Sequence, residues 1–117
     1  MKTKNIFNHN LDNQDFFNWN TADANRLVKA LLISAKNPDT LRIFIDDLLT
    51  KSEIKLCVTR LHAVNLIILG MPYTSIVQLT GLSSTTIARI SKQICNKKGG
   101  YYNTIQKMYP HGIRYFD

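Results

Sequence analysis

Hydroxyl-bearing and basic side chains gather between residues 73 and 94, and they are of the types that contact nucleic acid. A hydroxyl exchanges hydrogen bonds with phosphates and base edges, and a guanidinium matches the N7 and O6 atoms of guanine. The free backbone N–H groups at a helix N-terminus also favour phosphate. We therefore expect a DNA-binding surface formed by Tyr73, Thr74, Ser83, Ser84, Thr85, Thr86, Arg89 and Lys92.

Several of these side chains have alternative interpretations. Arg89 has three interpretations: a DNA contact, a residue that holds the carboxylate of a small ligand, or a solvated side chain. Ser83 acts only as a helix cap if its hydroxyl is engaged within the chain. Lys92, like Lys97 and Lys98 after it, either contacts phosphate or is solvated. The sequence leaves these alternatives open.

The residues lie on a predicted helix-turn-helix. Gly81 marks the turn, because glycine adopts a positive φ angle freely. Leu82 is expected to pack under the turn, and Ser83 to cap the second helix. Apolar spacing predicts an inner face made of Ile76, Val77, Leu79 and Thr80 in the first helix, and of Ile87, Ile90 and Ile94 in the second. The plainer alternative is an ordinary corner between two helices.

Capping signals divide the preceding chain into three helices. Thr21 or Asn20 starts the first, which begins near Ala22. Asn37 before Pro38 ends that helix and caps the second. The third helix is predicted to begin with the capping box Thr50-x-x-Glu53 and to end at Leu69. It has apolar residues on more than one face, so we expect it near the centre of a homodimer. It also carries Cys57, which we expect in the core.

A last short helix is predicted at residues 101–109, with Ile105 and Met108 facing inward. No long segment alternates between apolar and polar residues, so strands are not expected. The predicted fold class is all-α, with about six helices. We divide the chain into an irregular or disordered N-terminal arm (1–20), a helix-turn-helix domain (21–110) and a C-terminal tail (111–117).

Composition favours a nucleic-acid partner. The 117 residues suit one small domain, and their formal net charge is +7. From Ser84 onward six basic residues face only one acidic residue, Asp117. We see no signal peptide, no apolar run of membrane-spanning length and no disulfide framework, so we expect a cytoplasmic, nucleoid-associated protein. We find no metal-ligand spacing, phosphate loop or nucleophile motif, so we expect no metal and no enzyme.

Four pieces of the chain follow one another in a characteristic order: Leu49-Thr50-Lys51-Ser52-Glu53, Thr59-Arg60-Leu61, Leu69-Gly70 and Thr80-Gly81-x-Ser83-x-x-Thr86-Ile87-x-Arg89. This ordered set resembles the Trp repressor superfamily, and in particular its TrpR-like YerC/YecD branch. The glycine pair with Tyr101 after the second helix of the motif is also similar to that branch. The resemblance implies an intertwined, all-helical homodimer that binds operator DNA and regulates transcription.

The resemblance also implies a ligand pocket. In tryptophan-responsive members two arginines sandwich the indole of the corepressor, and Arg60 and Arg89 fall on those positions. The next residue is glycine in those members but Ile90 here, and its branched side chain would intrude. We therefore expect no tryptophan bound in that way and no cofactor, and leave open whether another small molecule acts instead.

Together these features predict a sequence-specific DNA-binding transcriptional regulator, a repressor that acts as a homodimer. One alternative is a helix-turn-helix used as a protein assembly surface or as a nonspecific architectural DNA binder. Another is the DNA-reading accessory part of an enzyme such as a transposase, with catalysis on a different chain.

Overall fold

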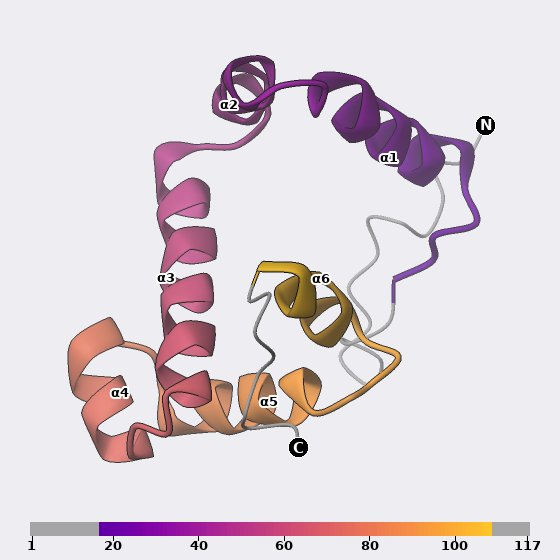
Figure 1. Ribbon diagram of the computed structural model, residues 1–117. Helices are drawn as coiled ribbons and strands as arrows, with labels where there is room; N and C mark the ends of the chain where they lie inside the picture. The colour runs from indigo at the N-terminus through magenta and orange to yellow at the C-terminus, as the bar shows by residue number, and fades with distance from the viewer. Residues whose placement is uncertain (1–16, 109–117) are drawn as a thin grey trace. The chain divides into compact units, whose positions relative to one another are not determined.

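The computed structural model describes residues 17–108, and this part of the chain is all-helical, as predicted (Figure 1). It contains six helices and no strands. In chain order these are α1 (Ala22–Ser34), α2 (Pro38–Leu48), α3 (Lys51–Ile68), α4 (Tyr73–Thr80), α5 (Ser84–Ile94) and α6 (Gly100–Met108). The predicted arm and tail lie largely outside the described residues, so that division of the chain stays a prediction.

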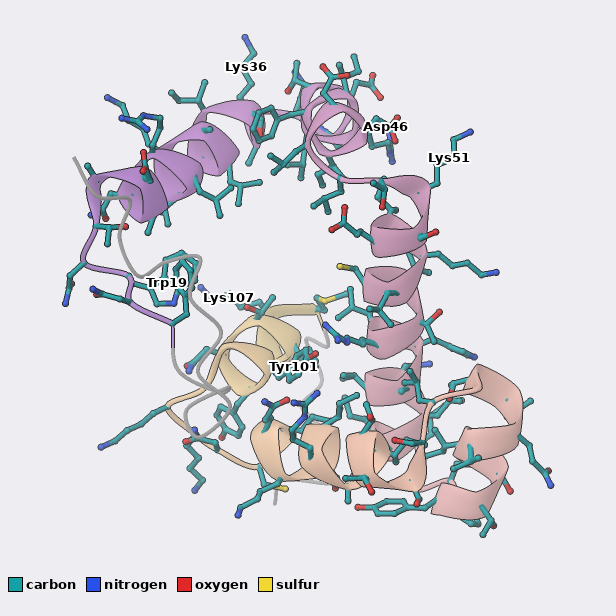
Figure 2. The ribbon with its side chains drawn as sticks, turned by 180° about the vertical axis from the view of Figure 1, so that it is seen from behind. Trp19, Lys36, Asp46, Lys51, Tyr101 and Lys107 are labelled. Carbon is teal, nitrogen blue, oxygen red and sulfur yellow. The ribbon has the colours of Figure 1, made fainter. Side chains whose placement is uncertain are left out.

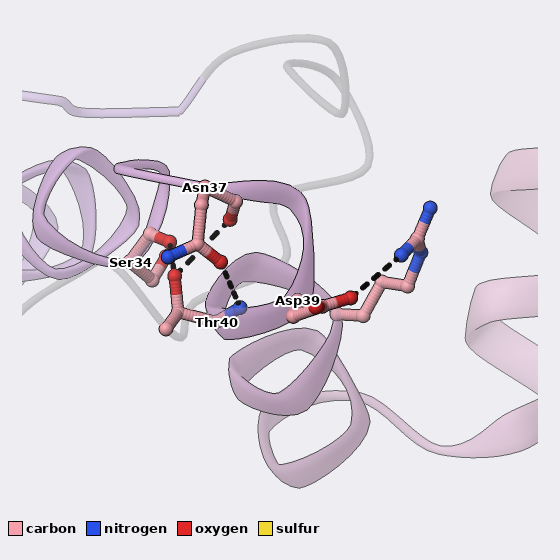
Figure 3. Close-up of polar contacts among 5 residues, drawn as sticks. Ser34, Asn37, Asp39 and Thr40 are labelled. Carbon is pink, nitrogen blue, oxygen red and sulfur yellow. Dashed lines mark hydrogen bonds and ion pairs between the residues drawn. The ribbon is translucent and has the colours of Figure 1, made fainter.

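Short polar side chains set the helix starts where the sequence predicts them. The Thr21 hydroxyl accepts a hydrogen bond from the Ala24 N–H, and Asn37 Oδ1 accepts one from the Thr40 N–H at 2.9 Å (Figure 3). Each satisfies a backbone donor that the first helical turn leaves unpaired. Pro38 occupies the first turn of α2, where its missing N–H costs nothing.

The described helices group into two compact units that divide between Thr50 and Lys51. In the first unit α1 packs against α2. The corner between them is held by the Thr40 hydroxyl, which donates to the Ser34 carbonyl at 2.7 Å and lies 3.1 Å from the Asn37 carbonyl (Figure 3). No residue of α2 is fully buried, and large apolar side chains such as Leu32 and Ile43 are exposed. Among the described residues of this unit only Ala24 of α1 is buried.

The second unit, α3 to α6, holds the hydrophobic core. Helices α3, α4 and α5 pack against one another, and α6 packs on α5 (Figure 1). Aliphatic side chains from all four helices form the cluster: Ala63, Val64, Leu66, Ile67, Ile76, Ile87, Ile90, Ile94 and Ile105. Burial of such side chains is the main favourable term in folding. The core therefore fixes α4 and α5 against the C-terminal half of α3.

Three side chains expected to face inward are exposed in this chain. Leu79 is 59% exposed and Met108 63% exposed, and Cys57 is exposed as well. Helix α4 is only two turns long, and its contact with the core passes through Ile76, with Val77 packed beside it. Cys57 lies on the N-terminal half of α3, where no residue is buried; the buried residues of α3 begin at Ala63.

Candidate nucleic-acid interface

The turn between α4 and α5 has the geometry of a helix-turn-helix. Gly81 ends α4 with φ 77°, the left-handed conformation that glycine adopts freely, as predicted. Its N–H donates to the Val77 carbonyl at 2.9 Å. The Thr80 hydroxyl donates to the Ile76 carbonyl at 2.7 Å and accepts the Leu82 N–H at 3.2 Å. The Thr80 hydroxyl therefore adds two hydrogen bonds to the backbone of the turn, which an apolar side chain could not make.

Helix α5 has one buried face and one exposed face. Ile87, Ile90 and Ile94 are buried, as their spacing predicts. On the opposite side Thr85 and Lys92 lie seven residues apart, which places them two turns apart on the same face. The exposed residues of this helix are Ser84, Thr85, Ala88, Arg89, Lys92 and Gln93. Small, hydroxyl-bearing and basic side chains thus stand on the surface of α5 that is free to approach a partner.

The hydroxyls at the start of α5 divide into two kinds. Ser83 Oγ accepts the Thr86 N–H at 3.1 Å and lies 2.9 Å from Thr86 Oγ1, so it is a helix cap engaged within the chain. Ser84 and Thr85 are exposed, and within residues 17–108 neither side chain caps the helix as Ser83 does. They are the hydroxyls best placed to bond phosphate or a base edge.

Tyr73 and Thr74, the first residues of α4, are exposed. Pro72 stands at the cap position of this helix and supplies no side-chain cap. The N-terminus of α4 therefore carries backbone N–H groups without a side-chain cap and two exposed hydroxyl-bearing residues, a combination that suits phosphate.

A cavity of ≈ 820 Å³ lies among α3, α5 and α6, and Arg60 and Arg89 both line it. The resemblance implied this pairing, although 28 residues separate the two arginines in sequence. Ile90 lines the same cavity and is only 2% exposed, so its side chain belongs to the packed core. Arg89 thus borders both the cavity and the exposed face of α5.

Much of the cavity lining was not predicted from the sequence. Gln93 follows Arg89 by one helical turn, so helical spacing could have placed it on the same side of α5. The lining from the α5–α6 connection and from α6 includes Asn96, Tyr101 and Thr104. Tyr101 lies on the side of α6 that faces α5 (Figure 2). Only the packing of α6 brings these residues to the arginines, and no local pattern signals it.

This geometry defines a helix-turn-helix protein with a basic, hydroxyl-rich exposed face on its second helix. The family model described as Trp repressor protein matches residues 23–109. The chain therefore belongs to the Trp repressor family, a family of helix-turn-helix DNA-binding regulators. No curated protein and no solved structure matches the chain.

Two further findings concern the described residues only. No helix among residues 17–108 is both long enough and apolar enough to cross a membrane. Within the same range no three or more His, Cys, Asp or Glu side chains lie together in a way that could hold a metal ion.

Proposed function

We propose that the protein is a sequence-specific transcriptional regulator, a repressor that binds operator DNA as a homodimer. The observation that carries the proposal is the two-faced character of α5. Buried isoleucines anchor it to α3 and α4, while Ser84, Thr85 and Lys92 stand exposed on it. Such a helix enters a major groove with its N-terminal residues at the base edges. Two of them in a dimer would read half-sites roughly 34 Å apart.

The homodimer is supported by exposed apolar side chains in both units of the described chain. In the first unit these are Val28, Leu32, Ile33, Ile43 and Leu48, and on α3 of the second unit they are Leu56, Val58 and Leu61. Apolar surface of this extent is normally covered by a partner. We infer that a second copy covers it, because a symmetric dimer buries the same patch on both subunits.

We further propose that tryptophan is not the corepressor. Ile90 occupies space in the core beside Arg60 and Arg89, where a planar aromatic ligand would have to enter between the arginines. The glycine pair with Tyr101 supports placement in the YerC/YecD branch. A regulator of this kind would work in the cytoplasm on the nucleoid, where Cys57 and Cys95 would remain thiols.

Selection from a pool of random duplex DNA, followed by sequencing of the bound fraction, tests the proposal. Enrichment of a palindrome with half-sites about one helical turn apart is the expected result. Retention without enrichment would instead support a nonspecific architectural binder. Folded protein that retains no duplex at low salt would support the assembly-surface alternative. Adding tryptophan should change neither the enriched sequence nor its affinity.

A further inference from the structure

The connection between α5 and α6 carries two lysines on a backbone that is tied at both ends. From the α5 side, Asn96 Oδ1 accepts the Lys98 N–H at 3.1 Å and the Asn96 carbonyl accepts the Gly99 N–H at 2.8 Å. From the α6 side, Asn103 Nδ2 donates to the Lys97 carbonyl at 3.1 Å and to the Gly99 carbonyl at 2.8 Å. The two asparagines therefore hold this loop, residues 96–99, in one conformation.

The loop continues the chain beyond the C-terminal end of α5. Asn96 comes eleven residues after Thr85 and four after Lys92, so a helix carried that far would place all three on one side. At 1.5 Å per residue the loop begins roughly 16 Å beyond Thr85 along the helix axis. It lies at the end of α5 that is away from α4 (Figure 1). With Thr85 at base edges, the loop would reach the phosphate strand that borders a major groove about 12 Å wide.

The stretch of sequence on both sides of the loop carries charge of one sign. Residues 54–108 contain seven lysines and arginines and no aspartate or glutamate. Lys97 and Lys98 are both exposed. A run of solvated surface charge normally mixes both signs, whereas an unbroken excess of cations is the footprint of a polyanionic partner.

From these observations we propose that the 96–99 loop is a second DNA contact outside the helix-turn-helix, in which Lys97 and Lys98 bind backbone phosphates. Asn103 is a positioning residue that holds the two lysines in place. The inference rests on the proposed function, because it needs the exposed face of α5 to meet DNA. Phosphate contacts carry no base information, so the loop sets affinity and register and leaves sequence preference to α5.

The test measures binding by fluorescence anisotropy over a salt series, with the selected operator and with a scrambled duplex of equal length. Each phosphate contact contributes about 0.9 to the slope of log affinity against log salt. K97A and K98A should therefore each lower the affinity for both duplexes roughly eightfold at 0.1 M salt, and the loss should shrink as salt rises. The double variant should lower the slope by about two.

The matched control is K107A, which removes the same charge from α6 outside the loop (Lys107 is labelled in Figure 2). It should weaken binding clearly less than K97A or K98A. Equal losses from all three variants would show a general charge effect and overturn the inference. So would a double variant with the affinity and slope of the wild type.

N103A separates positioning from charge. It keeps every cation and places a good helix former within α6, but it removes both hydrogen bonds to the loop carbonyls. Affinity for both duplexes should fall at unchanged circular dichroism, and wild-type affinity would contradict the positioning role.

These outcomes separate the inference from the proposed function. Wild-type protein that binds both duplexes equally, and is weakened by K97A, would refute the sequence-specific function and leave the loop contact standing. Wild-type protein that binds neither duplex would overturn both.

Discussion

Ile90 anchors α5 in the hydrophobic core. Its side chain is 2% exposed and lies in the core cluster that joins α5 to α3 and to Ile105 of α6. In the same place it lines the cavity beside Arg60 and Arg89. A side chain of the protein itself therefore fixes α5 against α3 and α6.

The packing of Ile90 predicts a large loss of stability on truncation. Ile90→Ala should lower the free energy of unfolding by about 2–5 kcal/mol, because it removes buried methyl groups and leaves a cavity. Urea denaturation followed by circular dichroism measures the loss. Leu79→Ala is the control, since that side chain is mostly exposed and should change stability by no more than about 0.5 kcal/mol. Similar losses in the two variants would contradict the packing.

Gly81 is a second position where a single residue decides the geometry. Its φ is 77°, and a Cβ added there would meet no atom within 4 Å. Gly81→Ala should therefore cost only the backbone strain, about 1–2 kcal/mol. Gly100→Ala is the matched control, because that site is equally open and no positive φ is recorded there. It should be neutral or slightly stabilising in thermal denaturation.

At the scale of the element, the two faces of α5 have separate roles, because the residues that pack in the core are not the residues that are exposed. The face that contacts the core is entirely isoleucine, and the exposed face takes no part in that packing. Substitutions on the exposed face can therefore change DNA binding while the fold stays intact. Mutations in α5 should thus separate cleanly into those that affect folding and those that affect recognition.

Thr85→Ala and Lys92→Ala test this separation. Both should weaken binding to the selected operator, and Lys92→Ala should also lower the salt slope by about one. Circular dichroism and the thermal midpoint should match the wild type. Thr59→Ala on α3 is the control, since its hydroxyl donates to the Lys55 carbonyl within that helix and does not belong to the exposed face of α5. Unchanged operator affinity in both α5 variants would remove them from the contact surface.

At the scale of the whole molecule, burial is uneven between the two units. The second unit holds the core cluster, whereas α1, α2 and the start of α3 carry apolar side chains that are exposed in the part of the chain that the structure describes. Exposed apolar surface of that extent is costly in water. We infer that the fold is completed by association, which makes DNA affinity depend on protein concentration.

A charge placed among the exposed apolar side chains of α3 should therefore break the proposed dimer. Val58→Lys puts an ammonium where the side chain is 61% exposed in one chain and would be buried against a second copy. Light scattering at micromolar concentration should show a dimer for the wild type and a monomer for the variant. Operator affinity should fall along with the dimer, because one subunit reaches only one half-site. A monomeric wild type would refute the homodimer.

The local features of this fold were readable from the sequence. The caps at Thr21, Asn37 and Ser83 and the left-handed Gly81 depend on contacts within three or four residues, so short patterns reveal them. The isoleucine spacing in α5 likewise identifies its buried face. These signals were enough to predict the all-α class and the helix-turn-helix, and the resemblance pointed to the family.

Only the tertiary structure decided what each face meets. It exposed Leu79 and Met108, whose spacing alone predicts burial, because α4 and α6 are short and contact the core through few side chains. It also gathered α3, α5 and α6 around one cavity and tied the 96–99 loop through Asn103. Helical periodicity specifies which residues share a face, but packing between distant segments determines whether that face is covered.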